Sequence, residues 1–280
     1  MNQQENVCGM VIHNGILKTA DELTPFPLNT AVIYEVIRLI SGVPLFIEAH
    51  LDRMNHSLQL AGVTEKIELP PVREAVKRLT SLCSVSNQNI RLNAWLEEGR
   101  IHWTGYFVES HYPDYANYQK GVPTGLLRLE RTNPNAKVWP SHLKAVVAQQ
   151  CADRQLFEMI LVDPRELISE GSRSNLFFTQ GDTLVTAPDE AVLQGITRLR
   201  LMDIIQEKGI SLIKREIAVS ELETFDGAFI TGTSIHLLPV VRMDTWERQS
   251  SKQPLIRQLM GLFDEMVQAY RLAHTYERDQ

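Results

Sequence analysis

Residues 168–178 of this chain read ISEGSRSNLFF, a carboxylate in a run of glycine and serine that lies between two apolar segments. Upstream, Lys144 ends the triplet His142-Leu143-Lys144 at the head of a helix-like segment. Downstream come two turns rich in small and hydroxyl-bearing residues, Gln194-Gly195-Ile196-Thr197-Arg198 and Thr231-Gly232-Thr233-Ser234. The C-terminal half of the chain therefore combines a lysine, a carboxylate and two hydroxyl-rich turns.

This combination matches the chemical needs of pyridoxal 5'-phosphate. A lysine amine forms a Schiff base with the cofactor aldehyde, and a carboxylate such as Glu170 keeps the pyridine nitrogen protonated, because opposite charges favour each other's charged forms. Backbone N–H groups at the start of a helix, with a threonine hydroxyl, hold a phosphate dianion. Gly195-Ile196-Thr197, which runs into the helix-like residues 198–205, has that form.

Two further motifs lie in the N-terminal half, Tyr34-Glu35-Val36-Ile37-Arg38 and the segment 47–54, IEAHLDRM. The C-terminal half adds Pro239-Val240 and Asp244 to the motifs given above. In their order and spacing these motifs resemble the fold-type IV pyridoxal-phosphate enzymes, the class IV aminotransferase family. That family includes branched-chain and D-amino-acid aminotransferases and aminodeoxychorismate lyase.

The resemblance implies a role for each matching residue. Lys144 would be the Schiff-base lysine and Glu170 the partner of the pyridine nitrogen. The phosphate would be held by the residues that match the family's phosphate site, which are Arg53, Gly195, Ile196, Thr197 and Thr233, with Ser234 near the phosphate or the substrate carboxylate. Asn175 would lie near the cofactor, and Tyr34 would face the substrate. From the residues alone, Tyr34 fits a core position equally well, and Arg53 fits an exposed one.

The substrate is the open part of the assignment. In the D-amino-acid branch an Arg-Gly strand end and an Arg-Asn-His run meet the substrate carboxylate, but here residues 94–102 read AWLEEGRIH. Glu97 and Glu98 would repel a carboxylate at close range. The candidate substitutes for the missing substrate ligands are Arg91, Arg100 and His102. Val36 stands where one form of the lyase has a catalytic threonine, which disfavours the lyase.

We therefore expect a pyridoxal-phosphate-dependent class IV aminotransferase that moves an amino group between an amino acid and a 2-keto acid by a ping-pong mechanism, with a branched-chain-like substrate slightly favoured. The alternative is aminodeoxychorismate lyase, which eliminates pyruvate to give 4-aminobenzoate. A catalytically silent family member is disfavoured, because Lys144 and Glu170 are both retained. The resemblance also implies a homodimer with the active site near the interface.

Composition and sequence patterns argue against several other classes of protein. A net charge of −6 over 280 residues, without clustered basic residues, argues against nucleic-acid binding. No signal peptide and no apolar run long enough for a membrane helix is visible, so we expect a cytoplasmic protein. The histidines show no ligand spacing, and no metal site is expected. Cys8, Cys83 and Cys151 are scattered and odd in number, which predicts reduced thiols.

The pattern of apolar residues and turns predicts an α+β protein of two lobes. A smaller N-terminal α/β domain would span residues 1–118, and a larger C-terminal domain with the lysine and the cofactor site would span residues 119–280. Asn14-Gly15 predicts a hairpin turn, and Pro70-Pro71 predicts the start of a helix. Further helices are expected at residues 48–60, 198–208 and 254–271, and a loop at 132–140 that leads to Lys144.

Overall fold

The computed structural model describes residues 6–22, 32–129 and 141–275, with the side chains of residues 141–143 left aside. The chain divides into two compact units, of which unit 1 is Met1–His111 with Val267–Gln280 and unit 2 is Tyr112–Met266. The boundary expected from the sequence lay after residue 118, with the whole C-terminus in the second domain. The loop expected at 132–140 lies outside the described residues. Among the helices described, none is long and apolar enough to span a membrane.

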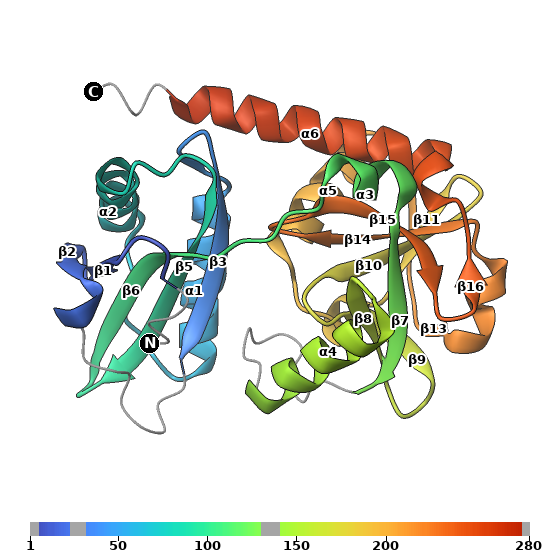
Figure 1. The fold of residues 1–280 in the computed structure, drawn as a ribbon, viewed down its shortest axis with the longest axis horizontal. Helices are drawn as coiled ribbons and strands as arrows, with labels where there is room; N and C mark the ends of the chain where they lie inside the picture. The colour runs from blue at the N-terminus through green and yellow to red at the C-terminus, as the bar shows by residue number, and fades with distance from the viewer. Residues whose placement is uncertain (1–5, 23–31, 130–140, 276–280) are drawn as a thin grey trace. The chain divides into compact units, whose positions relative to one another are not determined.

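Unit 1 is built on an antiparallel sheet with the strand order β2-β1-β6-β5-β3-β4 (Figure 1). Asn14 and Gly15, with φ of 48° and 82°, connect the first two strands. Because a tight hairpin turn needs positive φ at both central residues, Asn-Gly favours this connection, and the predicted hairpin is confirmed. The strands are β1 Met10–His13, β2 Ile16–Thr19, β3 Ile33–Ile40, β4 Val43–Pro44, β5 Gln88–Glu97 and β6 Arg100–Val108.

Helices α1 (Ile47–Leu60) and α2 (Leu69–Leu82) cover one face of this sheet. Buried and half-buried residues alternate along β3, so that Ile33, Glu35, Ile37 and Leu39 point toward the helices. The core between sheet and helices contains, among others, Ile37, Leu51, Met54, Val76, Leu79 and Phe107. The opposite face of the sheet carries Tyr34 and the other residues of its parity.

Unit 2 is built on a mixed sheet with the order β12-β11-β10-β14-β15-β7-β8-β9-β13, to which β16 adds beside β15. In β8 all five residues are buried, as expected for a strand covered on both faces. The core contains Val122, Ile160, Phe178, Ile230 and Trp246. The strands are β7 Val122–Arg128, β8 Glu158–Val162, β9 Leu167–Gly171, β10 Asn175–Gln180, β11 Thr183–Thr186, β12 Ser211–Lys214, β13 Ile217–Ala218, β14 Gly227–Gly232, β15 His236–Met243 and β16 Trp246–Glu247.

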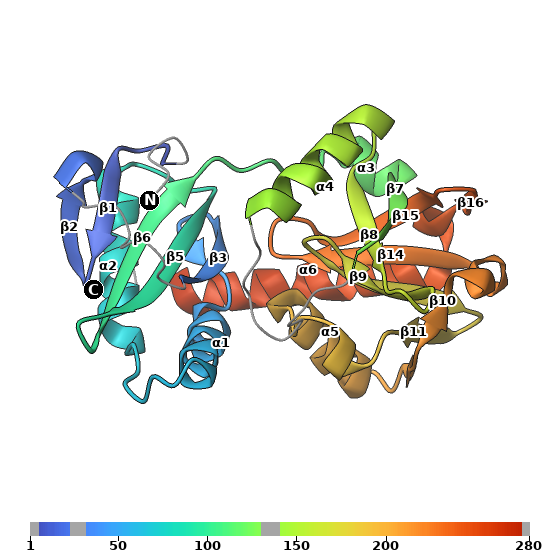
Figure 2. The ribbon, with the colours of Figure 1, turned by 90° about the horizontal axis from the view of Figure 1, so that it is seen from below.

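The helices of unit 2 pack on different strands of its sheet (Figure 2). Helix α3 (Tyr115–Lys120) contacts β15, α4 (Ser141–Arg154) contacts β8, and α5 (Ile196–Glu207) contacts β14. Helix α6 (Pro254–Thr275) begins in unit 2, and its last residues belong to unit 1, where the Tyr270 ring packs on that of Phe46. The α+β fold with two sheets confirms the predicted fold class.

Several local predictions need correction. The Gly/Ser-rich sequence around Glu170 predicts a turn, but Glu170 lies within strand β9, and a bend follows at residues 172–174. Residues 110–121 are rich in Tyr, Asn and Pro without apolar periodicity, which predicts an irregular domain junction. They contain α3 instead, because the Asp114 side chain accepts a hydrogen bond from the Asn117 N–H and forms a capping box. The capping box thus stabilises the first turn of α3, although this helix has no apolar stripe.

The cysteine prediction is also wrong. Cys8 and Cys83 form a disulfide with a Cα–Cα distance of 6.0 Å, and Cys151 is the free thiol. The two half-cystines are 75 residues apart in the sequence. They meet because α2, which ends just before Cys83, packs on β1, which begins just after Cys8. Their spacing in the sequence carries no sign of this packing.

Candidate active site

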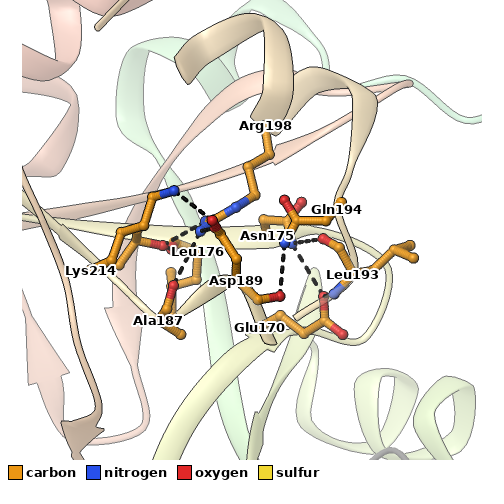
Figure 3. A network of polar contacts seen from close by, with 10 residues as sticks. Glu170, Asn175, Leu176, Ala187, Asp189, Leu193, Gln194, Arg198 and Lys214 are labelled. Carbon is orange, nitrogen blue, oxygen red and sulfur yellow. Dashed lines mark hydrogen bonds and ion pairs between the residues drawn. The ribbon is translucent and has the colours of Figure 1, made fainter. Parts of the chain in front are cut away.

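Glu170 is a buried carboxylate at the edge of the polar network drawn in Figure 3. It is 2% exposed, and its Oε2 accepts hydrogen bonds from the Leu193 N–H at 3.0 Å and from Asn175 Nδ2 at 3.2 Å. A buried carboxylate is costly unless donors compensate it. These two donors, one from β10 and one from the segment before α5, fix the direction of the Glu170 side chain.

Asn175 joins the Glu170 carboxylate to the start of α5. Its Nδ2 also donates to the Leu193 carbonyl at 2.8 Å, so that both amide hydrogens are used. Its Oδ1 lies against Gly195, where an added Cβ would overlap it. A side chain at Gly195 would collide with Asn175, so this close approach requires glycine. The place of Asn175 near a cofactor stays a prediction.

The first turn of α5 presents backbone donors that have no acceptor among the described residues. Gly195 is the N-cap residue, no side chain caps it, and the first intrahelical bond runs from the Leu199 N–H to the Gly195 carbonyl at 2.9 Å. The N–H groups of Ile196, Thr197 and Arg198 are consequently those that an α-helix leaves without intrahelical acceptors. With the helix dipole they form a site suited to an anion such as a phosphate.

The end of β14 lies beside the start of β10 in the sheet. Asn175 of β10 pairs with Thr231 of β14, and the half-buried Thr233 and Ser234 follow in the turn to β15. Thr231 is 1% exposed, and its Oγ1 makes no hydrogen bond within the described part of the chain. Unit 2 thus gathers Glu170, Asn175, the start of α5 and a hydroxyl-rich turn at neighbouring positions.

Arg53 lies in unit 1 and is held by Glu35. Its Nε and Nη2 donate to the two Glu35 oxygens at 2.7 and 2.6 Å, and His50 Nδ1 lies 2.7 Å from Glu35 Oε2. The side chains of Arg53 and Glu35 are 10% and 1% exposed. The network fixes the guanidinium of Arg53; its phosphate role stays a prediction.

The four predicted substrate residues share one face of the unit 1 sheet, opposite to the helices. Tyr34 pairs with Asn93, and the guanidinium of Arg91 lies 4.6 Å from the centre of the Tyr34 ring. His102 is next to Trp95, with ring centres 5.7 Å apart, while Arg100 is exposed at the strand end. The structure therefore brings Tyr34 and Arg91 together and leaves Arg100 apart from them.

Lys144 lies on α4 as expected, but its side chain is exposed. A lysine bonded to a cofactor whose ring contacts the buried Glu170 would itself be shielded from water. The covalent role of Lys144 stays a prediction, and its exposure weighs against it.

Sequence reasoning missed three buried charged residues: Glu35, Glu158 and Arg198. A signal existed for two of them. Glu158 begins the otherwise apolar strand EMILV, and Arg198 places a cation in the first turn of a helix, where the dipole opposes it. Within the residues that the structure covers, no group of three or more His, Cys, Asp or Glu side chains could hold a metal ion.

Comparison with known proteins gives one family and a consistent fold. The family model for amino-transferase class IV matches residues 32–243. The branched-chain-amino-acid aminotransferase-like protein 2 of Arabidopsis thaliana is 26% identical over 255 residues, which cover 84% of this chain and 45% of that protein. The chain thus spans less than half the length of this relative.

Two solved structures show the same fold. A branched-chain amino acid aminotransferase from Thermobaculum terrenum in its PLP form has a TM-score of 0.81 at 18% identity, with 97% of each chain covered. A putative 4-amino-4-deoxychorismate lyase from Legionella pneumophila has a TM-score of 0.78 at 18% identity, with 88% of this chain and 97% of that chain covered.

Proposed function

Because the chain belongs to the class IV aminotransferase family, we propose that it binds pyridoxal 5'-phosphate and transfers an amino group between an amino acid and a 2-keto acid. The observation that carries this proposal is the connection of Glu170 through Asn175 to the first turn of α5. A carboxylate and an anion site are thereby held in one rigid arrangement.

The residues of unit 2 fit this cofactor. Glu170 supplies a fixed carboxylate for the pyridine nitrogen, and the N–H groups of Ile196 and Thr197 supply donors for the phosphate. The buried Thr231 hydroxyl, without a partner among the described residues, marks a polar group suited to a ligand. Thr233 and Ser234 would complete the phosphate site.

Bound pyridoxal phosphate supplies an electron sink for the negative charge that develops at the substrate Cα. The protein's part is to hold protons and orient groups. Glu170 would hold the pyridine nitrogen in its protonated form, and the free amine of the active-site lysine would take the proton from the substrate Cα. The two half-reactions, on the donor and then on the keto acid, give ping-pong kinetics.

The covalent lysine has two candidates. Lys144 is the residue expected from the sequence, and its side chain is exposed on α4. Lys137 stands seven residues before Lys144 in the sequence and lies outside the described residues. We propose that one of these two lysines carries the cofactor, and the exposure of Lys144 favours Lys137.

A branched-chain-like substrate is supported by the names of the relatives and by the apolar Val36 on the face that carries Tyr34 and Arg91. On this face Arg91 would bind the carboxylate of the substrate. We further propose a homodimer, as the family resemblance implies. The lyase remains the second function, because a putative 4-amino-4-deoxychorismate lyase shares the fold.

The test is an absorbance spectrum of the purified protein with added pyridoxal phosphate, followed by a panel of L- and D-amino acids. A visible cofactor band that an amino acid bleaches, with release of its keto acid, supports the aminotransferase and identifies the donor. Pyruvate and 4-aminobenzoate formed from aminodeoxychorismate would instead identify the lyase. A protein that shows no cofactor band would contradict both functions.

The lysine is assigned by reduction of the holoprotein with borohydride and peptide mapping. Lys137→Ala and Lys144→Ala form a matched pair of variants. We expect the variant of the labelled lysine to lose turnover and the other to keep it. A label on neither residue would refute the assignment to this segment.

A further inference from the structure

Arg198 is a buried cation in the first turn of α5 to which the proposed reaction assigns no role. Its side chain is 1% exposed, and burial lowers its pKa, which shows that the environment disfavours the charged form. It also stands near the positive end of the helix dipole, where a cation is unfavourable. A cation buried at such a position needs favourable interactions to stabilise it.

The contacts of Arg198 connect α5 to two strands and to the short helix after them (Figure 3). Nη1 donates to Thr186 Oγ1 at 2.8 Å, and Nη2 donates to the Ala187 carbonyl at 3.1 Å and to Asp189 Oδ1 at 3.0 Å. The Thr186 hydroxyl in turn donates to the Leu176 carbonyl at 2.7 Å. Thr186 ends β11, and Leu176 follows Asn175 in β10.

The start of α5 is therefore fixed at two points on β10. Gly195 lies directly against Asn175, and Arg198 reaches Leu176 through Thr186. Asn175 also binds Glu170. Both contacts therefore fix the first turn of α5 relative to the Glu170 carboxylate. Loss of either would allow the first-turn N–H groups to move relative to Glu170.

The charges around Arg198 suit an anion. Lys214 Nζ binds the other oxygen of Asp189 at 2.6 Å, so that two cations share one carboxylate. Arg198 and Lys214 carry two positive charges against the one negative charge of Asp189, and the Glu170 carboxylate also acts electrostatically on Arg198. The Arg198 guanidinium is buried, so its charge is screened less than that of the exposed Lys214.

We propose that Arg198 is a positioning residue for the cofactor phosphate, which fixes the first turn of α5 in place and adds positive charge behind it. This inference rests on the proposed binding of pyridoxal phosphate. It assigns the Arg198 side chain no direct contact with the cofactor.

The experiment compares the dissociation constants of pyridoxal phosphate and of pyridoxal, which lacks the phosphate, for the wild-type apoprotein and three variants. In Arg198→Gln we expect the constant for pyridoxal phosphate to rise by about tenfold or more, and that for pyridoxal to change by less than about threefold. Inorganic phosphate should also compete less well. Arg200→Gln, which removes a cation from the same helix outside this network, should leave both constants unchanged.

The ratio of the two constants separates positioning from a general loss of structure. A folded Arg198→Gln protein with the wild-type ratio would overturn the inference. If that variant does not fold, Thr186→Val, which removes the connecting hydroxyl at similar volume, provides the test, and an unchanged ratio there has the same meaning. A wild-type protein that binds neither compound would instead refute the proposed function.

Discussion

At the scale of single residues, Glu158 is a buried carboxyl group whose surroundings favour its neutral form. It is 1% exposed at the start of β8, its Oε1 accepts the Arg173 N–H at 2.6 Å, and its Oε2 has no partner in the described structure. An ionised Oε2 would be an uncompensated charge. Burial accordingly raises the pKa of Glu158 above its usual value of 4.5.

A raised carboxyl pKa means that the folded state holds the proton more tightly than the unfolded state. The stability that Glu158 contributes is then complete below pH 4.5 and is lost as the pH rises through its folded pKa. Glu158→Gln cannot ionise, so we expect its free energy of unfolding, relative to that of the wild type, to increase between pH 5 and pH 8. Urea denaturation at both pH values measures this.

Glu166→Gln is the control for this pH effect. Hydrogen bonding to Arg128 lowers the pKa of Glu166, so its contribution is lost only as the pH falls below the usual carboxyl range. The difference between this variant and the wild type should stay constant from pH 5 to pH 8. A constant difference for Glu158→Gln as well would show that Glu158 is ionised in the folded protein.

At the scale of elements, the link between β3 and α1 is an ion-pair network inside unit 1. Glu35 projects from β3 onto the helix, where it binds Arg53 and His50. The alternation of β3 places this carboxylate on the core face among isoleucine and leucine, where only strong pairing makes it tolerable.

Glu35→Ala would remove the carboxylate that binds the almost buried guanidinium of Arg53. We expect the free energy of unfolding of unit 1 to fall by about 3–5 kcal/mol, the usual cost of breaking a buried ion pair. Urea unfolding followed by the fluorescence of Trp95 and Trp103, both in unit 1, measures this loss. The exposed Glu74→Gln on α2 should change stability by less than about 0.5 kcal/mol. Equal effects of the two changes would contradict the network's importance.

At the scale of the whole molecule, the two units have separate hydrophobic cores, and a disulfide joins distant parts of only one of them. The bridge from Cys8 to Cys83 lies within unit 1, whereas the free Cys151 lies in unit 2. A cross-link over a loop of this length stabilises mainly by restricting the unfolded chain.

Reduction should therefore lower the stability of unit 1 by about 2–5 kcal/mol and leave unit 2 unchanged. Scanning calorimetry with and without a reductant measures both transitions. Cys83→Ser should reproduce the effect of the reductant, and Cys151→Ser should not. A non-reducing peptide map without a linked pair of peptides containing Cys8 and Cys83 would refute the bridge.

The sequence by itself determined the family motifs and the main elements of the fold. Asn14-Gly15 and Pro70-Pro71 act through local backbone geometry, and the amphipathic stripes of α1 and α6 act through burial, so these features are visible in short windows. Gly195-Ile196-Thr197 likewise marked the start of α5, because an anion site at a helix N-terminus has a local pattern.

Tertiary structure alone decided the contacts between distant segments. The disulfide, the binding of Glu35 to α1 and the connection of Arg198 through Thr186 to β10 all join residues whose proximity follows from sheet order and helix packing. Glu170 was found from its motif, but its direction depends on Asn175 and on Leu193, which lies 23 residues further along the chain. The physical reason is that side-chain type is a local property, whereas burial and partnership arise only when the chain has folded.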